Sequence, residues 1–118
     1  MTRAAHFEKA DESVRAIYDR LLATVRTHGP VTEDVKKTSI HLVRETAFAG
    51  VSVRRSAIIL TVKSRSDITH PRIVRRERVS ANRWHLEVRL ETPAQVDRQL
   101  ARWLRAAYEM AGPVEGSR

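Results

Sequence analysis

Apolar and polar side chains alternate without interruption through Trp84-His85-Leu86-Glu87-Val88-Arg89-Leu90-Glu91. Because successive side chains of a strand point to opposite faces of a sheet, this period of two predicts a strand with one buried face. A less regular alternation predicts further strands at residues 40–43, 47–53 and 58–63, an arginine-rich strand at 73–79, and a short one near 31–35. Together they predict an antiparallel sheet over about residues 31–91.

An amphipathic helix is predicted on each side of this region. Over about residues 11–28, apolar side chains recur at helical spacing, and Asp11 lies where an N-cap carboxylate would accept the first free amides. Residues 93–111 carry a similar stripe, and Thr92 with Gln95 forms a candidate capping box at its start. Each segment is followed by a Gly-Pro pair, which ends a helix.

These elements predict a single α+β domain across residues 1–118, built from two layers. One apolar face per strand and one apolar stripe per helix each need a packing partner, so both helices should cover one face of the sheet. The expected order is an N-terminal helix, an antiparallel meander of five to six strands and a C-terminal helix. Residues 54–56 and 81–82 are the expected tight turns, and residues 114–118 are expected to form a loose tail.

Composition narrows the class of protein. The chain has 118 residues, of which 42% are hydrophobic and 31% charged, and it contains no cysteine. This balance is typical of a folded domain, and the lack of thiols excludes disulfides and cysteine-bound metals. The longest apolar run is Ala57-Ile58-Ile59-Leu60, far too short for a membrane span. We therefore expect a cytoplasmic protein without a membrane partner.

Positive charge is concentrated in the predicted sheet. Residues 36–83 contain 12 Lys+Arg and 3 Asp+Glu, a net charge of +9, whereas residues 1–35 carry −1 and residues 84–118 carry 0. A strongly basic sheet beside helices that are close to neutral indicates an acidic partner.

Two groups of polar side chains are candidate anion-binding residues. The first places cations beside a hydroxyl around one predicted strand, a combination that suits phosphate or carboxylate groups. It contains Lys36, Lys37, Thr38, His41 and Arg44. The second could follow a phosphate backbone across the strands. It contains Arg54, Arg55, Arg75, Arg76 and Arg78. Both groups also have a simpler interpretation as solvated surface, in which charged side chains discourage the pairing of edge strands.

A third candidate is the sheet face opposite the helices, where Val43, Phe48 and Ile59 are expected to face outward. An apolar patch with a polar rim predicts either a homodimer interface or a shallow ligand site. Alternatively, the sheet curls and partly buries these side chains itself. Aromatic residues make up only 5% of the chain, and Phe48 is the one expected to face solvent, so little base stacking is predicted.

Three parts of the chain together resemble a known family. They are Tyr18-Asp19-Arg20-Leu21, then Lys36-Lys37-Thr38-Ser39-Ile40 followed by Phe48-Ala49-Gly50-Val51, and finally Trp103-Leu104-Arg105-Ala106-Ala107-Tyr108-Glu109. They are similar to the bacterial domain of unknown function 5655, sometimes labelled predicted transport protein, over nearly the whole chain. The resemblance implies a domain that stands alone or is fused to other modules, including nuclease-like ones. Lys36-Lys37-Thr38 carries over as a family feature, without a catalytic role.

Three functions remain open from the sequence. The first is a non-enzymatic binding module whose basic sheet contacts an acidic partner, with nucleic acid as one possibility. The second is a protein interaction or homodimerisation module that uses the apolar patch, and the third is a domain that binds a small anionic ligand. An enzyme is the least supported class because no nucleophile, acid–base pair or phosphate-binding loop is recognisable. We expect no cofactor and no metal.

Overall fold

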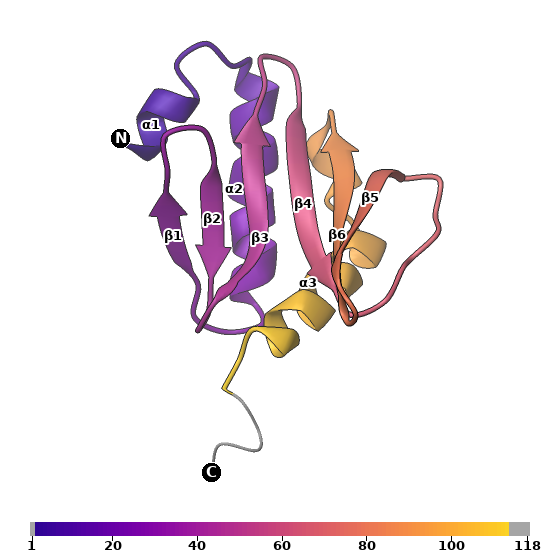
Figure 1. Ribbon diagram of the computed structural model, residues 1–118. Coiled ribbons are helices and arrows are strands. Elements are labelled where there is room, and N and C mark those ends of the chain that lie inside the picture. Colours follow the sequence, from indigo (N-terminus) through magenta and orange to yellow (C-terminus); the bar gives the residue numbers. More distant parts are fainter. Residues whose placement is uncertain (1, 114–118) are drawn as a thin grey trace.

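Helices and strands follow one another as the periodicity predicts in the computed structural model, which describes residues 2–113 (Figure 1). The helices are α1 (Arg3–His6), α2 (Glu12–Arg26) and α3 (Arg98–Met110), with a 3-10 turn at Pro93–Gln95 before α3. The strands are β1 (Thr32–Val35), β2 (Ile40–Val43), β3 (Ala47–Val53), β4 (Ile58–Ser64), β5 (Ile73–Ser80) and β6 (Arg83–Leu90). The short helix α1 was not predicted. The expected tail at residues 114–118 lies outside the described residues.

The six strands form one antiparallel sheet with the order β1-β2-β3-β4-β6-β5. Strands β1 to β4 are successive neighbours, whereas β5 and β6 form a hairpin whose second strand pairs with β4. Both α2 and α3 lie on the same face of the sheet, as Figure 1 shows, so the predicted two-layer α+β architecture is confirmed. Within residues 2–113, no helix combines the length and apolarity that a membrane crossing requires.

A continuous apolar core fills the space between the sheet and the two long helices. The strands contribute Ile40, Leu42, Val51, Ile58, Leu60, Val62, Val88 and Leu90, all at most 1% exposed. The facing stripes on the helices contribute Val14, Ile17, Tyr18, Leu21, Val25, Leu100 and Leu104. Full burial of an apolar side chain of this size stabilises a fold by about 1.5–3 kcal/mol, so the covered face holds the domain together.

The hydrogen bonds at the starts of α2 and α3 differ from the prediction. The Asp11 carboxylate caps no amide of α2; it accepts a hydrogen bond from the Ser56 hydroxyl at 3.0 Å, and the Asp11 amide donates to the Arg55 carbonyl at 2.8 Å. The capping box of Thr92 and Gln95 belongs to the 3-10 turn. The cap of α3 is Asp97, whose carboxylate accepts from the Leu100 amide at 3.0 Å. Sequence patterns therefore placed the first helix start correctly but not its hydrogen bonds.

Phe48 lies in the core, so the expectation that it faces outward is wrong. Its side chain is 0% exposed, and its ring meets the Tyr108 ring edge-on at a centroid distance of 5.4 Å. The cause is a bulge in β3, because Leu42 pairs with Ala49 and Val43 pairs with Ala47. The extra residue has no partner on β2, and it breaks the strict alternation that had assigned Phe48 to the outer face.

A polar cluster connects β1 with the helical layer. The Tyr18 hydroxyl donates to Glu33 Oε1 at 2.6 Å, the Arg3 guanidinium donates to the same oxygen at 3.0 Å, and Arg26 lies 3.7 Å from Glu33 Oε2. Partial burial alone would raise the pKa of Glu33, but these hydrogen bonds and positive charges outweigh it and lower that pKa. Burial and the bond to Glu33 raise the pKa of Tyr18. This cluster fastens β1, α1 and α2 together.

Candidate functional site

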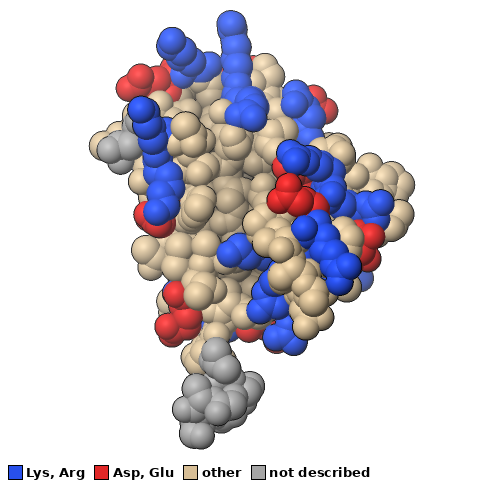
Figure 2. Space-filling model, viewed as in Figure 1, with Lys and Arg blue, Asp and Glu red and all other residues tan. Residues whose placement is uncertain are grey.

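The face of the sheet turned away from α2 and α3 is called the open face here. Its positions alternate with the core positions, as the pairing register requires. It presents His41 and Val43 on β2, Ala47, Gly50 and Ser52 on β3, Ile59, Thr61 and Lys63 on β4, His85, Glu87 and Arg89 on β6, and Arg75 on β5. The centre of this face is largely free of charged side chains in Figure 2, whereas Lys and Arg gather around it.

A hollow lies over Gly50 near the middle of the open face and has a volume of about 320 Å³. Gly50 pairs with His41 on one side and with Thr61 on the other, and Lys63 pairs with His85. The Gly50 hollow is lined by Ser39, His41, Ala47, Ala49, Gly50, Val51, Ser52, Thr61, Lys63 and His85. It exists because Gly50 places no side chain between its two neighbours.

The polar lining of the Gly50 hollow suits a negatively charged group. Within residues 2–113, its lining contains an ammonium, two imidazoles and three hydroxyls but no carboxylate. Lys63 forms no ion pair in this part of the chain. Charge-assisted hydrogen bonds to an anion are about twice as strong as neutral ones, so these donors favour an anion over a neutral ligand.

The predicted cations of the two hairpin turns lie at one end of the sheet, called the hairpin end. Lys36, Lys37 and Thr38 form the turn between β1 and β2, and Arg54 and Arg55 form the turn between β3 and β4. The Lys36 ammonium lies 3.0 Å from Asp34, and the Arg54 guanidinium donates to the Ser52 hydroxyl at 2.6 Å. The structure thus brings together at one end two turns that the sequence had assigned to separate groups (Figure 1).

A second hollow of about 520 Å³ lies at the hairpin end. It is lined by His6, Lys9, Ala10, Val53, Arg54 and Arg55, so several cations border it. Short helix α1 closes this end, where His6 Nε2 lies 2.7 Å from the Lys36 carbonyl oxygen. The N-terminal segment, for which no site was predicted, therefore contributes positive charge beside the two turns.

The three predicted arginines of β5 lie on an edge strand and are mostly engaged within the domain. Arg75 lies 3.4 Å from Glu77 and 3.6 Å from Glu87, and Arg76 lies 2.6 Å from Asp67. Arg78 is paired with no acid among the described residues; it donates to the Ser80 and Ala81 carbonyls. Only Arg75 lies on the open face, since Arg76 and Arg78 pair with Leu86 and Trp84 and so point to the side of the sheet that carries the helices.

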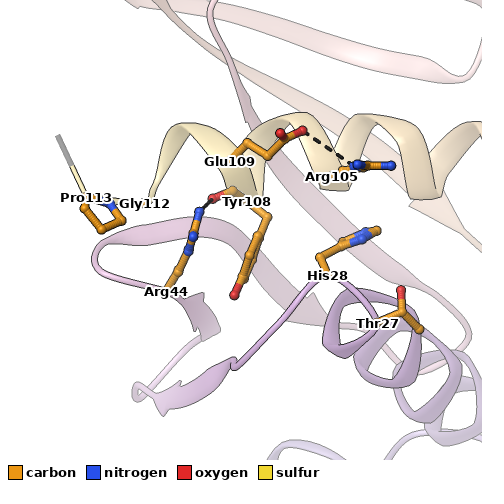
Figure 3. A pocket seen from close by; sticks show the side chains of 8 residues that line it. All are labelled: Thr27, His28, Arg44, Arg105, Tyr108, Glu109, Gly112 and Pro113. Carbon is orange, nitrogen blue, oxygen red and sulfur yellow. Dashed lines mark hydrogen bonds and ion pairs between the residues drawn. The ribbon is translucent and has the colours of Figure 1, made fainter. Parts of the chain in front are cut away.

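Arg44 does not join the cations with which the sequence grouped it. Strand β2 carries it to the opposite end of the sheet, where its guanidinium lies 4.4 Å from the centroid of the Tyr108 ring and donates to the Tyr108 carbonyl at 3.2 Å (Figure 3). A cation that binds a carbonyl in the last turn of a helix stabilises that helix end. A Cβ at Gly112 would collide with this guanidinium. Arg44 therefore fastens the end of α3.

Figure 3 also shows the larger cavity around Arg44, which has a volume of about 680 Å³. Arg105 lies 3.6 Å from Glu109, and the Tyr108 hydroxyl donates to the Pro30 carbonyl at 3.0 Å. Thr27 donates to the Thr24 carbonyl at 2.6 Å. Since most polar groups of this cavity already have partners within the chain, the cavity is a weaker site candidate than the smaller Gly50 hollow.

Comparison with known families identifies the family of this chain. Residues 3–111 match the family described as Domain of unknown function (DUF5655). The chain belongs to this family. No curated protein and no solved structure matches the chain significantly. Because the family description assigns no activity, a function has to be inferred from the residues of this DUF5655 domain.

Sequence reasoning did not select Gly50 of the DUF5655 domain as a site residue. A usable signal was present, because a glycine inside a strand often marks a close approach of a ligand. His41, by contrast, was predicted and does line the hollow. In the described part of the chain, no group of three or more His, Asp or Glu side chains is arranged to hold a metal ion.

Proposed function

We propose that the domain is a non-enzymatic, cytoplasmic binding module whose open face contacts an acidic partner, a nucleic acid. The observation that carries this proposal is the combination of an uncovered, hollowed sheet face with cations at its hairpin end and along its β5 edge (Figure 2). Lys36, Lys37, Arg54, Arg55 and, on β5, Arg75 are all exposed there. A surface of this kind attracts a phosphate backbone by charge and releases its counterions on binding.

The aromatic side chains favour contacts with phosphates over reading of bases. Phe7, Tyr18, Phe48 and Tyr108 are buried in the core. The two tryptophans are half-buried, and Trp103 packs edge-on against His70 at 5.4 Å. Proteins that hold single strands by stacking need exposed aromatic faces, which these residues do not supply. Binding should therefore depend little on base sequence.

Homodimerisation through the apolar patch has less support. With Phe48 in the core, the patch retains only Val43 and Ile59, and both are already half-buried. A stable protein interface needs a desolvated centre with large apolar or aromatic anchors. The centre of the open face instead presents His41, Thr61 and Lys63 around an empty space.

Fluorescence anisotropy with short labelled DNA and RNA, at low and at physiological salt, tests the proposal. We expect micromolar binding that weakens as salt rises, because phosphate contacts exchange with salt cations. Two triple variants distinguish binding at the open face from binding at the helices. Replacing Lys37, Arg54 and Arg55 at the hairpin end by Ser should weaken binding and lower the salt slope by about one for each lost phosphate contact.

Replacing Arg98, Arg102 and Arg105 by Ser is the matched control, since these exposed arginines lie on α3 and the charge change is the same. Equal losses in both variants would reject a site on the open face. An absence of binding even at low salt would reject the nucleic-acid proposal itself.

A further inference from the structure

The fold does not require a glycine at position 50. Gly29 has a φ of +148°, a conformation that side chains rarely adopt, and a Cβ there would collide with the Tyr108 hydroxyl. Gly50 has no such angle, and a Cβ at this position would meet only His41 Cδ2, at 3.8 Å. A glycine inside a strand lowers stability by about 0.5–1 kcal/mol relative to alanine. The empty position therefore has a cost and no structural benefit, which indicates that the space itself is used.

Hydrogen-bond donors from three strands surround that space. His41 and Thr61 flank Gly50 on the two neighbouring strands, which lie about 5 Å away on either side. Lys63 follows two positions after Thr61 on the same face, and His85 is its direct partner on β6. An ammonium, a hydroxyl and two imidazoles thus line the same hollow, and these donors suit a ligand with several anionic oxygens.

Carboxylates that border the Gly50 hollow are bound by cations outside it. Asp34, the β1 partner of His41, lies 3.0 Å from Lys36. Glu87, the partner of Thr61, and Glu77, the partner of His85, both pair with Arg75, at 3.6 and 3.4 Å. Lys63 is left without an acid among the described residues. These pairings reduce the repulsion that a bound anion would otherwise meet.

We infer that the Gly50 hollow binds one phosphate group, with Lys63 as its cation and with His41 and Thr61, the direct neighbours of Gly50, as hydrogen-bond donors. The inference rests on the proposed function, since the phosphate is a group of the acidic partner that occupies the open face. The volume of about 320 Å³ is roughly ten times the 30 Å³ that one water molecule takes up in the liquid, so a phosphate with an attached sugar can enter.

An NMR titration of the labelled protein with inorganic phosphate tests this site, with sodium chloride at equal ionic strength as the reference. We expect saturable shifts at the Gly50 amide and at the His41 and His85 rings. Lys63→Gln should weaken phosphate binding about tenfold, the effect of one lost charge-assisted hydrogen bond. Arg89→Gln is the matched control, because it removes a cation from the same face outside the hollow, and it should leave the affinity unchanged.

Gly50→Val fills the hollow without changing the charge, and we expect it to abolish phosphate binding while the domain stays folded. Equal weakening by Lys63→Gln and Arg89→Gln, or phosphate shifts outside the hollow, would overturn the site. If oligonucleotides still bind Gly50→Val and Lys63→Gln as tightly as the wild type, the phosphate site fails and the proposed function stands. If phosphate binds at the hollow but no oligonucleotide binds, the site stands and the nucleic-acid function fails.

Discussion

The two faces of the sheet differ in how fully their side chains are buried. On the covered face, Ile58, Leu60 and Val62 of β4 are fully buried against α2 and α3. On the open face, the alternating residues of that strand are half-buried, and the space above Gly50 is empty. Strand alternation allows this division, because each residue serves one face only. Stability and binding can therefore be altered separately, and the following predictions depend on that separation.

Phe48→Ala should have the largest effect on stability. Removing a fully buried aromatic side chain costs about 3–5 kcal/mol, which urea unfolding followed by circular dichroism will measure. Val43→Ala, on the half-buried open face, is the control and should cost about 1 kcal/mol. Similar losses for the two variants would contradict the bulge in β3 that turns Phe48 into the core.

Alanine substitutions at Gly29 and at Gly50 should have different effects on the free energy of unfolding. Gly29→Ala should lower the free energy of unfolding by about 1–3 kcal/mol, since it combines a strained φ with a displaced Tyr108 hydroxyl. Gly50→Ala should leave it unchanged or raise it by up to about 1 kcal/mol. Thermal melts of both variants give the comparison. A destabilised Gly50→Ala would mean that the fold does need this glycine.

Glu33 on the helical side makes a pH-dependent contribution. Because folding lowers the pKa of Glu33, its stabilising effect is present above the unfolded pKa and is lost as pH falls through the folded pKa. Glu33→Gln should therefore be less stable than the wild type at neutral pH, and the difference should shrink in acid. Glu8→Gln, an exposed control, should keep the wild-type profile in melts across the acidic range. Parallel profiles for Glu33→Gln and the wild type would contradict this assignment.

The smallest change in stability is expected for Thr61→Val on the open face. It preserves the shape of the side chain and removes only the hydroxyl, so the free energy of unfolding should change by no more than about 0.5 kcal/mol. Phosphate affinity, measured by the NMR titration, should nevertheless fall severalfold. A variant that loses stability while it retains full phosphate affinity would show that Thr61 stabilises the domain and does not bind phosphate.

Sequence periodicity was sufficient for the elements and the layers, because burial on one face produces the alternation seen in residues 84–91. It could not reveal the bulge, since one extra residue changes the phase of β3 and moves Phe48 to the other face. Nor could it place β6 between β4 and β5, because periodicity carries no information about partners.

The candidate site was only partly predictable for a related reason. Arg44 is close to Lys36 in sequence, but the intervening strand separates them by its full length. The hollow forms between four strands, so it depends on how these strands pair. The sequence of one strand does not determine that pairing. Gly50 weakens the strand pattern in sequence, and only the register shows that His41 and Thr61 stand on either side of it.

The most direct test of the division between the two faces is NMR mapping of a bound oligonucleotide. Isotope-labelled protein is titrated with a short single-stranded DNA at low salt, and the shifted amides are placed on the sheet. We expect shifts around the Gly50 hollow on β2, β3, β4 and β6 and at the hairpin end, with α2 and α3 unaffected. Shifts concentrated on α2 or α3, or no shifts at all, would contradict it.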